Sequence, residues 1–252
     1  MNDRLSWQRL LWLSRCDVLR NQRSWLIGAG AAALIALLVS LLSAYNGNVG
    51  DTFYRIFFIA ALFALGTIAT SQSFVDLHGR TTNTAFLMLP ASALEKTLVR
   101  LVLTTVGVFV SLLVLTTVLS WLFEGINALL FDVRRETFVP FDSLAWAMLP
   151  HYLVAQSLFF LGAAWFRKLH YVKTVGAALL IVHGLSAIAA GVGWLVFGPA
   201  SWGFGVRFGG DFDASFEWLG DTAKIFYYLV LPVFCWFVAW LRVTEAQVSH
   251  GV

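Results

Sequence analysis

The chain has 252 residues, of which 59% are hydrophobic and only 12% are charged, and its mean hydropathy is +0.78. Soluble domains contain about 25% charged residues and roughly 45–50% apolar residues, and a globule of this length has too little interior for so much apolar surface. This composition excludes an ordinary soluble enzyme, a disordered protein and a disulfide scaffold, and the formal net charge of +3 is too small to indicate nucleic acid binding. We therefore expect an all-α integral membrane protein.

Six stretches are long and apolar enough to cross a bilayer as helices, which takes about 20 residues. They cover residues 24–44, 52–74, 95–123, 141–166, 172–197 and 222–241. The first stretch follows an arginine-rich segment that is long for the start of a signal peptide, so we expect it to be retained. The two cysteines, Cys16 and Cys235, have no metal-site spacing and are not expected to pair.

Lysine and arginine indicate how the spans are oriented. The N-terminal segment, the second and fourth connections and the C-terminus hold 12 of the 17 Lys and Arg residues. Such residues remain on the cytoplasmic side of a membrane, so both termini are predicted to be cytoplasmic. We expect residues 1–23 to form a helix in the cytoplasmic interface, with arginines reaching lipid phosphates. The alternative is a plain continuation of the first span.

The connection over residues 75–94 contains two local signals. Ser92 and Glu95 have the spacing of a capping box at a helix start, and Pro90 fixes the preceding turn. Residues 78–89 are polar first and then apolar, so they could lie on the membrane surface and present side chains to a cytoplasmic partner. A solvated loop before a well-capped helix is the alternative.

The sequence Phe-Leu-Met-Leu-Pro-Ala-Ser-Ala-Leu-Glu-Lys leads into the third span. Together with six spans and an N-terminal helix, it resembles the permease subunit of ABC-2 type transporters, the class whose ATPase is a separate chain. The similarity covers the whole chain in architecture and residues 74–100 in sequence. In that family the second connection contains a coupling helix that docks in a groove of the ATPase. The resemblance implies an ATPase-coupling set of His78, Arg80, Asn83, Phe86, Met88, Pro90, Ser92 and Glu95.

The resemblance also implies where ATP is bound. The chain has no Walker A motif, which is the phosphate-binding loop of such ATPases. We therefore expect ATP and Mg on a partner ATPase present in two copies, and no catalytic site, cofactor or metal on this chain. It also lacks an H-E-x-x-H motif and paired carboxylates, so a membrane enzyme is disfavoured.

Small residues recur at helical spacing in two spans, and such residues let membrane helices approach closely. They are Gly28, Ala32 and Ala36 in the first span and Gly176, Gly184 and Gly191 in the fifth. In ABC-2 permeases these two spans line the dimer interface, so the resemblance implies contact with a second permease copy or a paralogue. Packing within the chain is the alternative.

Polar residues are sparse within the spans, and intramembrane ionisable residues usually mark functional sites. His183 is expected to be neutral and hydrogen-bonded to a neighbouring helix, with a proton site or a substrate contact as alternatives. His151 and Gln156 lie in the fourth span. Threonines and serines of the third span either line a pathway or bond back to their own helix. No carboxylate is expected deep in a span, which argues against proton pumping.

The two long connections on the opposite side differ in character. Residues 124–140 are expected to be a solvated charged turn. Residues 198–221 are rich in glycine and aromatic residues, and the resemblance implies short re-entrant helices there. The alternative is an aromatic loop resting in the membrane interface.

These expectations combine into one function. The chain is expected to be the permease subunit of a bacterial ABC exporter in the inner membrane, moving an amphiphilic or hydrophobic cargo by alternating access. The alternatives are an ATP-independent secondary transporter built as an inverted repeat, or a membrane scaffold or sensor subunit that transports nothing.

Overall fold

The computed structural model of the chain describes residues 6–46, 52–79, 86, 88–89, 91–132, 136–197 and 221–249. These residues are helical almost throughout and contain no strand. Six helical stretches among them are long and apolar enough to cross a membrane: Trp7–Tyr45, Phe53–His78, Ala93–Phe131, Ser143–Trp165, His170–Ile188 and Asp221–Gln247. They overlap the six predicted spans and confirm an all-α fold with six apolar helices of spanning length.

The elements follow one another in this order: α1 (Trp7–Tyr45), α2 (Phe53–Ser71), α3 (Val75–His78), α5 (Ala93–Val102), η1 (Leu103–Gly107), α6 (Val108–Phe131), α7 (Ser143–Ala147), α8 (Leu149–Trp165), α9 (His170–Phe197), η3 (Phe226–Val230) and α11 (Leu231–Ser249). The π-helical turn η1 joins α5 and α6 into one long helix. In the same way, η3 continues directly into α11.

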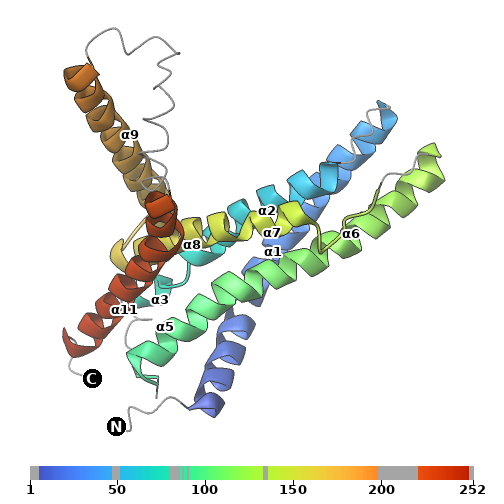
Figure 1. Cartoon of the computed structure of the whole chain (residues 1–252). Coiled ribbons are helices and arrows are strands. Elements are labelled where there is room, and N and C mark those ends of the chain that lie inside the picture. Colours follow the sequence, from blue (N-terminus) through green and yellow to red (C-terminus); the bar gives the residue numbers. More distant parts are fainter. Residues whose placement is uncertain are drawn as a thin grey trace.

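The helices α1, α2, α6 and α8 form one arm of the molecule, whereas α9 leaves this arm at an angle (Figure 1). Phe58 of α2, Phe109 of α6 and Tyr152 of α8 are at most 4% exposed and belong to the core of the arm. A second core lies where α5, α8 and α11 meet, around Phe74 and Phe160. The start of α1 and the end of α11 lie at the same end of the molecule (Figure 1).

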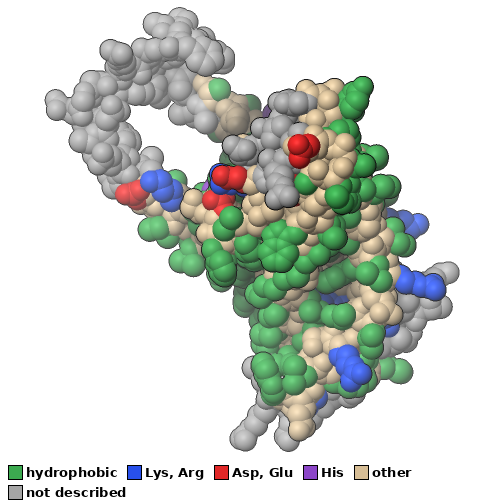
Figure 2. All heavy atoms as spheres, turned by 90° about the vertical axis from the view of Figure 1, so that its right-hand side faces the viewer, with side chains coloured by type: hydrophobic (Ala, Val, Ile, Leu, Met, Phe, Trp, Pro, Cys, Tyr) green, Lys and Arg blue, Asp and Glu red, His purple; other side chains and the backbone are tan. Residues whose placement is uncertain are grey.

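The outer surface of the described helices is apolar. Figure 2 shows hydrophobic side chains over much of one face, with few charged groups among them. Leu34, Ile35, Val106 and Val114 are each 58–60% exposed. Large apolar patches of this kind are unusual on soluble monomers, so this surface is consistent with helices that face lipid.

The N-terminal segment and the first span form one helix without a break. This agrees with the alternative expectation, a continuation of the span, although α1 changes direction along its length in Figure 1. Leu13 is buried against Ala91 and Val99, so the first part of α1 also packs on the start of α5. Its position in a membrane interface stays a prediction.

The predicted end of the third span is wrong. The helix does not stop at residue 123 but continues to Phe131, so the first part of the expected charged turn is helical. Glu124 is only 7% exposed and accepts a hydrogen bond of 2.6 Å from the hydroxyl of Tyr54. Asn127, one turn later, donates to Ser40 of α1 at 3.0 Å. These contacts with α1 and α2 satisfy polar groups that local sequence rules assign to a loop.

Candidate functional site

The start of α5 is held by Glu95, whose side chain is fully buried. The backbone N–H of Glu95 donates to Ser92 Oγ at 3.2 Å, and the N–H of Ser92 donates to Glu95 Oε2 at 3.0 Å. This reciprocal pair is the predicted capping box. The other oxygen, Oε1, accepts from the N–H of Ser6 at 3.0 Å and from Arg9 Nη2 at 2.9 Å. Glu95 therefore caps α5 and also fixes the beginning of α1.

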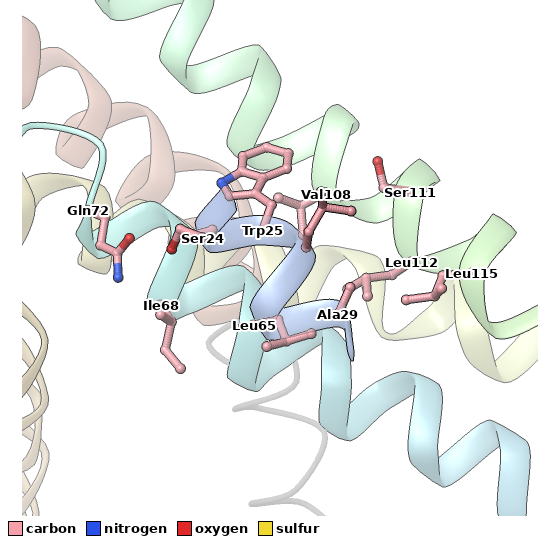
Figure 3. A pocket seen from close by; sticks show the side chains of 13 residues that line it. Ser24, Trp25, Ala29, Leu65, Ile68, Gln72, Val108, Ser111, Leu112 and Leu115 are labelled. Atoms are coloured by element: carbon pink, nitrogen blue, oxygen red, sulfur yellow. The ribbon is translucent and has the colours of Figure 1, made fainter. Parts of the chain in front are cut away.

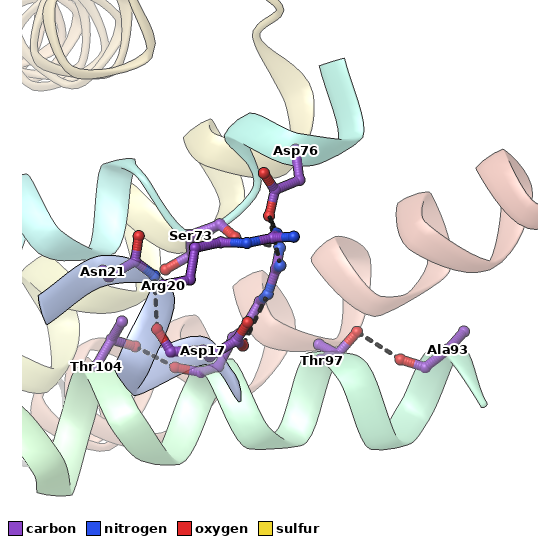
Figure 4. Close-up of polar contacts among 9 residues, drawn as sticks. Asp17, Arg20, Asn21, Ser73, Asp76, Ala93, Thr97 and Thr104 are labelled. Atoms are coloured by element: carbon purple, nitrogen blue, oxygen red, sulfur yellow. Dashed lines mark hydrogen bonds and ion pairs between the residues drawn. The ribbon is translucent and has the colours of Figure 1, made fainter. Parts of the chain in front are cut away.

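One turn and a half further along, Arg100 joins three segments of the chain. Its guanidinium lies 3.1 Å from Asp76 in α3 and 3.4 Å from Asp17 in α1, and it also donates to the backbone carbonyl of Ser73. Arg20 of α1 donates to Asp76 at 2.5 Å. Figure 4 shows these polar groups converging from α1, the end of α2 and α3. We call Asp17, Arg20, Asp76 and Arg100 the Arg100 cluster.

The predicted coupling residues fall into different environments. Phe86 is 2% exposed, and the guanidinium of Arg100 lies 4.4 Å from the centre of its ring. Phe86 belongs to the second core together with Phe74 and Phe160. This burial corrects the expectation that Phe86 faces a partner, because its ring is enclosed by residues of the same chain. Met88, by contrast, is 71% exposed and is available for contact.

His78, another residue of the predicted coupling set, is bound within the chain. The imidazole Nε2 of His78 lies 3.0 Å from the carbonyl oxygen of Ala163, and its ring stacks on His170 with 5.3 Å between centres. His78 therefore attaches the connection to the end of α8 and the start of α9. Arg80, Asn83 and Pro90 lie outside the described residues.

A polar network lies next to the Arg100 cluster within the helical arm. The Tyr152 hydroxyl donates to the backbone carbonyl of Thr104 at 2.6 Å, and Gln156 Nε2 donates to Thr104 Oγ1 at 3.0 Å. The indole N–H of Trp236 in α11 donates to Gln156 Oε1 at 3.0 Å. Thr104 belongs to η1, and π-helical turns often occur at functional sites. The network connects three spans: Thr104, Tyr152 and Gln156 are almost completely buried, and Trp236 is partly buried.

Thr104 also resolves one of the sequence alternatives. Its hydroxyl donates to the carbonyl of Arg100 at 2.8 Å, and Thr105 and Thr117 bond to carbonyls four residues earlier in the same way. These threonines bond back to their own helix, as one alternative stated. Thr104 also accepts a hydrogen bond from Gln156. The sequence did not predict this contact, because the two residues are 52 positions apart and no local pattern relates them.

The small residues of the first span differ in burial. Ala36 is 2% exposed and belongs to the core around Phe58, and a Cβ added to Gly28 would lie 3.6 Å from Leu65 of α2. Ala32 is partly buried on the same side of α1. Ala36 therefore packs within the chain, as the alternative stated, whereas contact of Gly28 and Ala32 with a second copy stays a prediction.

The small residues of the fifth span are in a different position. A Cβ added at Gly176, Gly184 or Gly191 would meet no atom within 4 Å, and Gly184 and Gly191 are exposed. Contact of these glycines with a second copy stays a prediction. His183 on the same helix lies 2.8 Å from the carbonyl of Leu179, so the expectation of a bond to a neighbouring helix is wrong.

The two cysteines lie in different surroundings. Cys16 is exposed, Cys235 is buried, and both are free. Among the described residues, no group of three or more His, Cys, Asp or Glu side chains could hold a metal ion. The predicted re-entrant segment lies outside the described residues up to position 220.

No protein-family model, curated protein or solved structure matches the chain.

Proposed function

We propose that the chain is the permease subunit of an ABC exporter in a bacterial inner membrane, driven by a separate ATPase. The observation that supports this most is the Arg100 cluster. It joins α1, the segment after α2 and the last turn of α5 at the arginine-rich end of the molecule. A subunit that receives force from a cytoplasmic partner needs such a junction between the contacted segment and the spans.

The route of the force follows the contacts. The ATPase would contact the connection around the exposed Met88, and displacement of that connection would reach α5 through Phe86 and Arg100. From η1 it would pass to α8 and α11 through Thr104 and Gln156. These contacts are packed or hydrogen-bonded, and coupling between sites is carried by such continuous elements when they have two arrangements.

The assembly would contain two permeases, either two copies or this chain with a paralogue, and two ATPase chains that bind ATP and Mg. This chain would change no covalent bond. An amphiphilic or hydrophobic cargo is favoured, because charged side chains buried in the described spans, such as Glu95 and Arg100, are already partnered inside the chain.

The test is site-specific photo-crosslinking in cells that also produce an ATPase encoded by a neighbouring gene. A photoreactive amino acid at Met88 is expected to crosslink to a protein with a Walker A motif. The matched control is Thr137, which is also exposed but lies in the connection between α6 and α7, on the predicted opposite side. A crosslink from both positions, or from neither, contradicts the proposal.

A second measurement separates an ATPase partner from an incidental neighbour. Purified ATPase should hydrolyse ATP at a different rate when the permease is present in the same membrane, and the Met88 crosslink should depend on nucleotide. If the rate is the same with and without the permease, the chain is better described as a secondary transporter or a scaffold.

A further inference from the structure

An open apolar pocket of about 300 Å³ lies between α1, α2 and α6 (Figure 3). Its wall includes Trp25 and Ala29 of α1, Ile68 of α2 and Leu112 of α6. This volume is at the lower end of the range of about 300–1,000 Å³ that is typical of ligand pockets. Leu26 and Ile68 at its rim are 71% and 41% exposed, so the pocket opens on the apolar outer surface of the arm.

A small polar recess of about 30 Å³ adjoins this pocket and shares Trp25, Ala69 and Gln72 with it. The recess is lined by polar groups that include Ser73 and the ion pair between Arg100 and Asp17. About 10–15 Å³ of such space is enough for one water molecule, so the recess has room for a small polar group. In the described part of the chain, Ser73 Oγ is buried without a hydrogen-bond partner, which is costly for a hydroxyl.

The recess and the pocket follow one another along the third span, from Thr104 to Leu115. At about 1.5 Å per residue this distance is about 16 Å, which is close to half of the roughly 30 Å hydrocarbon core of a bilayer. The polar part lies at the arginine-rich end and the apolar part toward the middle of the span. In Figure 3, Gln72 lies at one end of the pocket and Leu115 at the other.

One exposed cation lies close in the chain to the polar end. Arg23 directly precedes Ser24, a residue of the pocket wall, and is exposed. Arg20, one turn before, is already paired with Asp76, so Arg23 is the cation on which the headgroup contact depends. A lysine or arginine near a membrane surface contributes about 1 kcal/mol to binding of anionic lipid. The site therefore combines an apolar chain pocket, a place for one polar atom and one nearby cation, Arg23.

We propose that this composite site binds one anionic phospholipid of the cytoplasmic leaflet. One acyl chain lies in the pocket, an ester or phosphate oxygen enters the recess beside Ser73, and the headgroup lies next to Arg23. An acyl chain gains little by moving from lipid into an apolar pocket, because both surroundings are apolar. Selectivity therefore comes from the headgroup charge and from the buried hydroxyl. The inference does not depend on an ATPase or on transport.

The experiment uses the full chain, purified in a neutral detergent and stripped of lipid. The midpoint of thermal unfolding is followed while palmitoyl-oleoyl phosphatidylglycerol, or phosphatidylcholine with the same chains, is added. The anionic lipid is expected to raise the midpoint at the lower concentration. Arg23→Gln should weaken the apparent affinity for phosphatidylglycerol about five-fold, the equivalent of one lost charge contact, and leave that for phosphatidylcholine unchanged.

Filling the pocket tests the position of the chain. Ala29→Phe should remove most of the stabilisation by both lipids, and Ser111→Phe, on the α6 wall, gives a second variant if the first does not fold. Leu38→Phe is the matched control, because Leu38 is 58% exposed on α1 outside the pocket. Equal stabilisation of the wild type by the two lipids overturns the proposal, as does an equal loss in the Leu38→Phe variant.

Discussion

Arg100 Nη2 lies 3.1 Å from the carboxylate of Asp76, and this one ion pair connects the third span with the short helix α3. The Arg100 side chain is only 7% exposed, whereas the side chains of Asp76 and Asp17 are 22% and 21% exposed. Burying a guanidinium costs several kcal/mol unless carboxylates and hydrogen bonds compensate. The positions of α1, α3 and α5 therefore depend on one another.

Replacing Arg100 by Gln should destabilise the protein by about 3 kcal/mol, since breaking a buried ion pair leaves its partners uncompensated. The measurement is unfolding of the purified chain in a denaturing-detergent titration. Arg55→Gln is the control: Arg55 Nε lies 3.2 Å from Asp142, but its side chain is 43% exposed, and such pairs contribute about 0–1 kcal/mol. A similar decrease in the free energy of unfolding in the two variants would show that the Arg100 cluster stabilises the protein no more than an exposed ion pair does.

Glu95→Ala should release the beginning of α1 from α5, because it removes the acceptor for Ser6 and Arg9. We expect trypsin to cleave faster at the N-terminal arginines of this variant, and stimulation of the partner ATPase to fall while membrane insertion is retained.

Ser92→Ala is the control for that experiment. It removes one capping bond, which typically costs about 1 kcal/mol, but keeps Glu95 paired with Arg9. Its cleavage rate at the N-terminus should match that of the wild type. A faster rate in both variants would assign the effect to the helix cap alone.

Glu95 also shows how far sequence patterns reach in this protein. The capping box is a local signal with a fixed spacing, and the structure confirms it. The bond to Arg9 joins residues 86 positions apart, and no local pattern contains it. Hydropathy likewise predicted all six spans. The end of α6, however, depends on distant residues: Tyr54 donates a hydrogen bond to Glu124, and Asn127 donates one to Ser40.

Gln156→Leu should cost about 1–3 kcal/mol, because it removes the acceptor of the partly buried Trp236 N–H and the donor to the buried Thr104 hydroxyl. A double-mutant cycle with Trp236→Phe measures the pairwise part of this cost. Once Gln156 is replaced, Trp236→Phe should destabilise the chain less than it does in the wild type. Strict additivity of the two changes would contradict the network.

Gly162→Ala should be destabilising by about 1–3 kcal/mol, the usual cost of overpacking. A Cβ at Gly162 would lie 1.9 Å from Thr174 Oγ1, so α8 and α9 would have to separate. At Gly125 of α6 a Cβ would meet nothing within 4 Å. Gly125→Ala should therefore be neutral or stabilising, since alanine favours a helix by up to about 1 kcal/mol over glycine. A thermal unfolding series of the two variants decides this.

The sequence pattern predicted close helix packing at Gly28 and Ala36, but it did not predict the close approach of α8 and α9 at Gly162. A repeat at every fourth residue is recognisable in a sequence, but a single glycine opposite a β-branched residue of another helix is not. The repeat also gave no information on which surface it faces. At Ala36 of α1 that surface proved to be the core of the arm.

The orientation of the spans is testable with the native cysteines. Cys16 is exposed near the start of α1, and Cys235 is buried, so a membrane-impermeant maleimide should react with Cys16 alone. If the arginine-rich end is cytoplasmic, as the distribution of Lys and Arg predicts, Cys16 should be labelled in inside-out vesicles and protected in intact cells. Cys16→Ser should abolish labelling.

A cysteine on the opposite side gives the matched control. In the Cys16→Ser background, Thr137→Cys, in the exposed connection between α6 and α7, should react from the outside only. Labelling of Cys16 in intact cells would reverse the predicted orientation, and with it the assignment of Met88 to a cytoplasmic contact.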